Sequence, residues 1–135
     1  MIISETKIRV RYGETDKMGY VYYGNYPLYY EIGRTEMFRE IGATYNKLED
    51  EGIMMPVLNL SAKYIKPAFY DDLLTVKTII KDIPGATIKF FYEIYNSDNE
   101  LINQGETTLA FIDAKSKRPC RPPKDFIAFI KKNMN

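Results

Sequence analysis

A carboxylate lies in a glycine-rich loop that leads directly into a predicted helix. Asp16 lies between Gly13 and Gly19, and the helix is expected to begin near Asn25. The first N–H groups of a helix have no intrahelical acceptor and carry partial positive charge. Such donors can polarise a carbonyl or hold an oxyanion, while a nearby carboxylate attacks that carbonyl or activates a water. This combination suits acyl transfer.

The same residues also fit a purely structural interpretation. An aspartate followed three residues later by glycine is typical of a turn in which the aspartate bonds its own backbone. The 12 tyrosines, many of them between positions 12 and 30, are equally typical of a core or an interface. Spacing alone therefore leaves both interpretations of Asp16 open and favours the turn.

Histidine is absent from the 135 residues, and Cys120 is the only cysteine. A serine or cysteine nucleophile paired with histidine, a histidine-ligated zinc and an intramolecular disulfide are therefore all excluded within one chain. Any acid or base must be a carboxylate, lysine, tyrosine or cysteine. Cys120 has no evident base near it in sequence, so we expect an exposed thiol rather than a nucleophile.

The charge balance argues against two classes of partner. Nineteen basic and 18 acidic residues leave a net charge of +1, without the excess expected of a nucleic-acid binder. The N-terminus lacks the apolar core of a signal peptide, and the longest uncharged run, 18–30, is too short and broken to span a bilayer. We expect no nucleic acid and no membrane as partner, and a cytoplasmic location.

A strand and a long helix must flank the Asp16 loop. Strict alternation predicts a strand within Ile3–Tyr12, and Pro27 suits the first turn of a helix that Gly42 ends. Gly33 is unfavourable in mid-helix and predicts close packing against a sheet. The buried stripe is expected to comprise Leu28, Ile32, Thr35, Phe38 and Ile41.

The rest of the chain is a short helix, four strands and a C-terminal helix. The short helix is predicted from Thr44 to Glu51, and a proline-rich tail leads to the last helix, Asp125–Lys132. The four strands are predicted at Met55–Lys66, Leu73–Ile80, Thr87–Tyr95 and Leu101–Ile112. This order favours one α+β domain over residues 1–135, with a sheet wrapped around the long helix. Open sheet edges favour a homo-oligomer.

The run from Arg9 to Gly42 resembles a known family signature. Its tyrosine, Glu-Thr-Asp, glycine, Val-Tyr, Asn-Tyr and Tyr-x-Glu-x-x-Arg-x-Glu elements stand at the spacing typical of hotdog-fold acyl-CoA thioesterases of the 4-hydroxybenzoyl-CoA thioesterase and YbgC type. Tyr64–Val76 and the closing strand also fit. The resemblance implies a hotdog fold, an antiparallel sheet around one long central helix, and a thioester hydrolase that needs no metal or cofactor.

The resemblance also implies roles for individual residues. Asp16 matches the catalytic carboxylate, as nucleophile or as general base, and the backbone amide of Tyr23 matches the oxyanion donor. Some members carry histidine at this position, so tyrosine there explains how a histidine-free chain can be a thioesterase. Glu31 and Arg34 favour a helix-face ion pair, and Asn25 a helix cap, over direct chemistry. Substrate-binding positions are expected at Gly19, Tyr22, Asn25, Glu31, Lys63 and Lys89.

The identity of the substrate is left open by the sequence. The turn that holds a basic cluster in the 4-hydroxybenzoyl-CoA type has only Lys81 here, so another nucleotide contact is needed. The candidates are Lys63, Lys66, Lys81, Lys89 and the basic tail Lys115–Arg121. We expect a small-to-medium acyl-CoA substrate and a homodimer or homotetramer. Two alternatives are an acyl-carrier-protein thioesterase and a hotdog domain that binds acyl thioesters without turnover.

Overall fold

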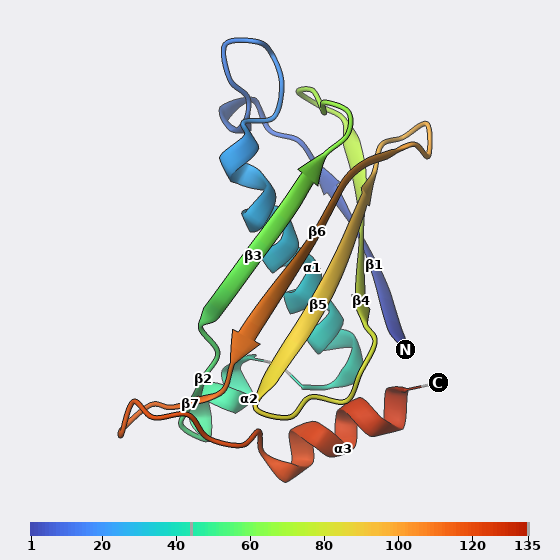
Figure 1. Ribbon diagram of the computed structural model, residues 1–135. Coiled ribbons are helices and arrows are strands. Elements are labelled where there is room, and N and C mark those ends of the chain that lie inside the picture. Colours follow the sequence, from blue (N-terminus) through green and yellow to red (C-terminus); the bar gives the residue numbers. More distant parts are fainter. Residues whose placement is uncertain (44, 135) are drawn as a thin grey trace.

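One long helix lies against a five-stranded antiparallel sheet in the computed structural model, which describes residues 1–43 and 45–134 (Figure 1). The strand order is β1-β4-β5-β6-β3, and every neighbouring pair is antiparallel. The strands are β1 (Ile2–Arg9), β3 (Val57–Tyr64), β4 (Leu73–Ile80), β5 (Thr87–Tyr95) and β6 (Leu101–Ala110). The central helix is α1 (Tyr26–Ile41), so the predicted α+β arrangement is present.

Shorter elements close the two ends of the sheet. The 3-10 turns η1 (Tyr12–Glu14) and η2 (Tyr23–Asn25) precede α1, and α2 (Tyr45–Asp50) follows it. The strands β2 (Ile53–Met54) and β7 (Ile112–Asp113) form a separate pair, so the predicted last strand divides after Ala110. The C-terminal helix α3 (Lys124–Asn133) packs at the end of the molecule opposite the Asp16 loop (Figure 1). Thr44, the predicted start of the second helix, lies outside the described residues.

The predicted close contact at Gly33 is confirmed. A Cβ atom at this position would lie 2.4 Å from Thr78 Oγ1 and 2.9 Å from Val76 Cγ1 of β4. Glycine therefore lets α1 approach the sheet more closely than any other residue would allow. The aromatic core follows from this approach: Tyr30 stacks on Tyr92 with ring centroids 4.4 Å apart.

The predicted buried stripe of α1 is wrong in part. Leu28 and Ile32 are 54% and 40% exposed, whereas Phe38 and Ile41 are buried as expected. The stripe that faces the sheet is rotated and comprises Tyr26, Tyr29, Tyr30, Gly33, Arg34, Met37, Phe38 and Ile41. Tyrosine counts as polar in a simple hydrophobic pattern, yet three of the buried residues of α1 are tyrosines.

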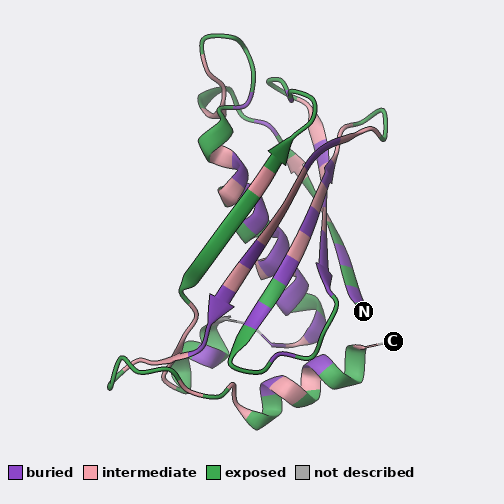
Figure 2. Cartoon of the chain, viewed as in Figure 1, coloured by how far each residue is buried: buried purple, intermediate pink, exposed green. Residues whose placement is uncertain are grey.

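The edge strand β3 is exposed on both faces (Figure 2). Leu58, Leu60 and Tyr64 have 61%, 40% and 50% of their surface exposed, although β3 alternates like a half-buried strand. The other edge strand, β1, instead buries Ile2 and Ser4. In the described part of the chain, no helix is long and apolar enough to cross a membrane.

Candidate active site

The loop between β1 and α1 is folded back on itself and pinned to the body of the protein. A bridge joins Thr15 to Val21, and the Asp16 N–H donates to the Tyr20 carbonyl at 2.8 Å. The Val21 N–H then donates to the Ala68 carbonyl, also at 2.8 Å, in the connection between β3 and β4. Because both arms of the loop are bonded, Asp16 sits in a defined position rather than on a free tip.

Asp16 uses one carboxylate oxygen to build its own turn. Its Oδ1 accepts from the N–H groups of Met18 and Tyr20 at 2.9 and 3.3 Å, and its carbonyl accepts from the Gly19 N–H at 3.0 Å. Gly19 takes a φ of 81°, which favours glycine. No donor within the described residues bonds Oδ2. The turn expected of Asp16 therefore exists and still leaves an oriented, half-buried carboxylate with one oxygen available.

Tyr23 begins the helical segment that runs on into α1. It is the first residue of η2, so its N–H points away from the turn that follows. Among the described residues, none accepts a backbone hydrogen bond from this N–H. Its carbonyl is held by the Tyr64 hydroxyl, which donates at 3.0 Å. Tyr23 is 64% exposed, although its ring contacts those of Tyr22 and Tyr64.

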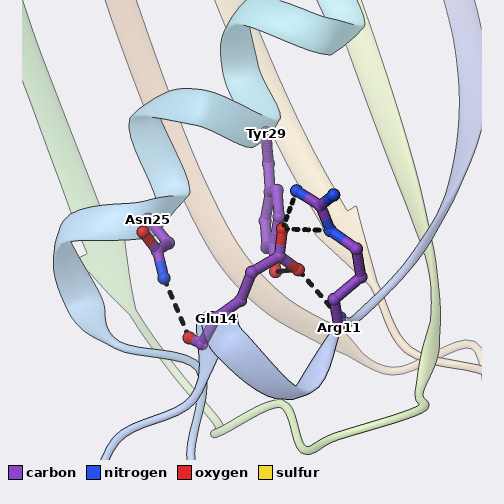
Figure 3. Close-up of polar contacts among 4 residues, drawn as sticks. All are labelled: Arg11, Glu14, Asn25 and Tyr29. Atoms are coloured by element: carbon purple, nitrogen blue, oxygen red, sulfur yellow. Dashed lines mark hydrogen bonds and ion pairs between the residues drawn. The ribbon is translucent and has the colours of Figure 1, made fainter.

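Glu14 joins the Asp16 loop to α1 (Figure 3). Its Oε1 accepts from the Arg11 N–H and from the Tyr29 hydroxyl, both at 2.9 Å, and the Arg11 guanidinium lies 3.2 Å from Oε2. Its backbone carbonyl accepts from the Tyr22 N–H at 2.9 Å and from Asn25 Nδ2 at 2.8 Å. Burial alone raises the pKa of Glu14, but these donors outweigh burial and hold the pKa below its usual value.

Two predicted helix residues take structural roles. Asn25 does not cap α1, because its side-chain amide instead reaches across the loop to the Glu14 carbonyl. Glu31 is 64% exposed and lies 3.9 Å from the Arg34 guanidinium, as the ion-pair interpretation expects. Arg34 itself is buried and donates to the Tyr92 hydroxyl at 3.4 Å.

The tyrosines of this region divide between core and surface. Tyr26, Tyr29 and Tyr30 are buried, whereas Tyr22 and Tyr23 are exposed. Burial, with the nearby Tyr64 as a smaller contribution, raises the pKa of Tyr26 to about 12. The ring centroids of Tyr26 on α1 and Tyr64 on β3 lie 5.3 Å apart, so aromatic contacts extend from the helix to the edge strand. The exposed rings of Tyr22 and Tyr23 pack against each other with their centroids 4.7 Å apart.

Lys63 and Lys89, the two predicted substrate-binding lysines, lie on a different face of the chain from Asp16. Lys63 lines a shallow cavity with Lys81 and Phe91 on the outer face of the sheet, the face that α1 does not cover. Lys89 is exposed on the same face, 6.0 Å from the Phe91 ring. The Lys81 ammonium lies 3.9 Å from the centre of that ring. Arg121, from the basic tail, lines a separate groove beside α3.

The contacts of Glu14, Tyr29 and Tyr64 around the Asp16 loop were not predicted from the sequence. Glu14 was noted only within the Glu-Thr-Asp element of the signature, and neither tyrosine had an assigned partner. Each makes its decisive contact with a residue at least 15 positions away, Tyr29 with Glu14 and Tyr64 with Tyr23. No local pattern signals such contacts.

Comparison with known proteins gives a consistent family. The model of the thioesterase-like superfamily matches residues 10–130. YneP from Bacillus subtilis (strain 168) is 36% identical over 126 residues, covering 93% of this chain and 91% of the relative. The acyl-CoA thioester hydrolase YbgC from Escherichia coli O6:H1 is 33% identical over 124 residues, covering 92% of each chain.

Solved structures agree with the sequence comparisons. The DHNA-CoA thioesterase from Staphylococcus aureus superposes with a TM-score of 0.93 at 36% identity, covering 98% of this chain and 91% of that one. Its likeness confirms the predicted hotdog arrangement of sheet and central helix. On these matches, the chain belongs to the thioesterase-like superfamily of hotdog-fold proteins.

Proposed function

We propose that this protein hydrolyses acyl-CoA thioesters, with the Asp16 carboxylate as the catalytic group and the Tyr23 backbone N–H as the oxyanion donor. Membership of the superfamily makes the chain a thioester hydrolase. The single observation that carries the proposal for the site is the half-bonded Asp16 carboxylate, held in a pinned loop just ahead of the start of α1. The names of YbgC and of the Staphylococcus aureus relative support coenzyme A as the thiol.

The chemistry requires only groups that the chain supplies, together with water. Attack on the thioester carbonyl moves an electron pair onto its oxygen, and an N–H at a helix start stabilises that negative charge. Collapse of the intermediate breaks the C–S bond and releases the coenzyme A thiolate. If Asp16 attacks, an acyl anhydride forms and a water then hydrolyses it. If Asp16 is a general base, it takes a proton from the attacking water.

Replacing Asp16 by asparagine tests the proposal. Asp16→Asn keeps an acceptor oxygen for the turn but loses the negative charge and most of the basicity. We expect kcat on a panel of acyl-CoAs to fall by about 10²–10⁴-fold, measured as released thiol. The matched control is Asp113→Asn, since Asp113 also bonds two backbone N–H groups of its own turn, at 2.9 Å each. Wild-type rates for Asp16→Asn would remove Asp16 from the mechanism.

Isotope labelling tests whether Asp16 acts as a nucleophile or as a general base. In a single turnover in ¹⁸O-labelled water, a general-base mechanism places the label directly in the released acid. A nucleophilic mechanism in which water attacks the Asp16 side of the anhydride places the label in the Asp16 carboxylate instead. Mass spectrometry of the peptide that contains Asp16 reports this difference.

We also propose that the protein is a homodimer formed along β3. Leu58, Leu60 and Tyr64 expose apolar surface on an unpaired edge strand, which soluble proteins usually cover. Leu28 and Ile32 on α1 are also exposed, at 54% and 40%. Because Tyr64 contacts both Tyr23 and Tyr26, a partner that pairs with β3 would lie beside the candidate site. Pairing of two identical edges is the closed arrangement that a two-fold axis allows.

A further inference from the structure

We propose that Glu14 is a positioning residue that sets the separation between the Asp16 carboxylate and the Tyr23 N–H. This inference rests on the proposed function, because it concerns the residue that holds the proposed catalytic carboxylate and the proposed oxyanion donor at a fixed distance. Glu14 is two residues before Asp16 in the loop. Its carbonyl is bonded to Tyr22 and to Asn25, which lie on either side of Tyr23. One residue therefore contacts the segments that carry both groups.

The carboxylate of Glu14 ties this arrangement to the helix. Tyr29 lies in the first turn of α1, is 1% exposed, and donates its hydroxyl to Glu14 Oε1 at 2.9 Å. The side chain of Glu14 is 16% exposed, so water competes little for these bonds. A carboxylate with a neutral hydroxyl and a backbone N–H on one oxygen is held in a single orientation. Displacement of α1 relative to the loop would have to break this bond.

A purely local role for Glu14 explains only part of the contacts. Closing the η1 turn needs the Arg11 N–H to Glu14 Oε1 bond and the Glu14 N–H to Arg11 carbonyl bond, at 2.9 and 3.0 Å. Arg11 has 82% of its side chain exposed, and such an exposed ion pair contributes little. The bonds to Tyr29, Tyr22 and Asn25 all leave the turn and end on the segments that begin α1. The bonds from Tyr22 and Asn25 end on the backbone carbonyl of Glu14, whereas the bond from Tyr29 ends on its carboxylate, so the bond to Tyr29 is the contact through which the side chain positions the loop.

The test compares variants by their effect on kcat and on KM. Glu14→Ala removes the side-chain link, and misplacement by about 1 Å can cost on the order of 100-fold in rate. We expect kcat for acyl-CoA to fall by about 100-fold and KM to change less than about threefold, because the substrate contacts stay in place. Tyr29→Phe breaks only the hydroxyl bond and keeps the ring, so we expect a fall of about 10-fold.

A conservative substitution of Glu14 distinguishes a positioning role from a role of its negative charge. Glu14→Gln retains an acceptor oxygen for Tyr29 and Arg11 while losing the charge, so we expect kcat within about fivefold of wild type. The double variant Glu14→Ala with Tyr29→Phe should be no slower than Glu14→Ala alone, since both changes remove the same bond. The matched controls are Glu93→Gln and Tyr95→Phe, because Tyr95 donates to Glu93 at the same 2.9 Å on β5. Both should keep wild-type kcat.

Each outcome decides between the proposals. Wild-type kcat in Glu14→Ala, with Asp16→Asn inactive, overturns the positioning role and leaves the proposed function intact. A Glu14→Gln variant as slow as Glu14→Ala shows that the charge itself acts, which also overturns positioning. Full activity of Asp16→Asn refutes the catalytic assignment on which the inference rests. If Glu14→Ala does not fold by circular dichroism, Tyr29→Phe decides the question, and a wild-type kcat there overturns the proposal.

Discussion

Substitution of Gly33 by alanine should destabilise the protein, although alanine is the better helix former. A Cβ at position 33 would lie 2.4 Å from Thr78 Oγ1 and 2.9 Å from Val76 Cγ1, and both partners are fully buried. Neither is the free end of a flexible side chain, so α1 or β4 must move. The helix would have to lift by about 1 Å to restore ordinary contact, which opens the packing of its neighbours.

The expected loss follows from two opposing effects. Alanine gains about 1 kcal/mol of helix propensity over glycine. Overpacking of a well-packed core costs about 1–3 kcal/mol, and two contacts under 3.0 Å place this site at the upper end. We therefore expect the free energy of unfolding to fall by about 2 kcal/mol. For a chain of this length that corresponds to a decrease in Tm of roughly 5–8 °C.

Urea unfolding followed by circular dichroism, with calorimetry for Tm, measures the change. Gly85→Ala is the control, because a Cβ there meets nothing within 4 Å, and we expect a change within about 0.5 kcal/mol. Thr78→Ala removes the closest atom, whose hydroxyl has no hydrogen-bond partner in the described chain. Gly33→Ala should therefore cost about 1 kcal/mol less in the Thr78→Ala background. A Gly33→Ala protein as stable as wild type would refute the close packing of helix and sheet.

Three further predictions concern the edge strand β3, the buried hydrogen bond between Tyr92 and Thr107, and the dependence of stability on pH. Leu60→Asp should convert the proposed dimer to a 15.8 kDa monomer in light scattering, whereas Ile83→Asp, exposed at the far end, should leave the mass unchanged. Tyr92→Phe removes the hydroxyl that lies 2.6 Å from Thr107 Oγ1 and should cost about 1–3 kcal/mol in urea unfolding, and no loss would mean that this bond is not formed. Because the folded-state pKa of Glu14 lies below its unfolded value of 4.5, its carboxylate stabilises the protein above that pH and ceases to do so as pH falls through the folded value. The free energy of unfolding of wild type should therefore exceed that of Glu14→Gln by about 1 kcal/mol at pH 7, and a Tm difference that does not shrink as pH falls below 4.5 would contradict this.

Local patterns in the chain were sufficient for most element boundaries. Runs rich in β-branched and aromatic residues predicted β4 and β5 at the bounds that the structure has, Leu73–Ile80 and Thr87–Tyr95. Pro27 and Gly42 predicted the two ends of α1, and Gly42 indeed takes a φ of 81° at the C-terminal cap. These signals succeed because turn, cap and strand preferences act between residues close in sequence.

Burial was harder to predict because it depends on which surface the helix meets. Leu28 and Ile32 had the spacing of a buried stripe, but α1 turns a row of tyrosines to the sheet instead. Gly33 at the contact and Gly105 under Tyr30 make room for those rings, since a Cβ at Gly105 would lie 2.4 Å from the Tyr30 hydroxyl. Volume matching between α1 and the sheet, at Gly33 against β4 and at Tyr30 against Gly105, favours this rotation of the helix, and no spacing rule contains that information.

The sequence by itself determined the chemistry that is possible and where in the chain it must occur. Without histidine, the acid or base had to be a carboxylate, lysine, tyrosine or cysteine, and the resemblance of the motif around Asp16 to the family signature made Asp16 the candidate. Only the tertiary structure decided how that carboxylate is held: its own turn occupies Oδ1, and Glu14 links the loop to Tyr29 and Asn25. Residue types are local and can be read along the chain. Distances between a loop and a helix depend on packing across the whole fold, so they exist only once the chain has folded.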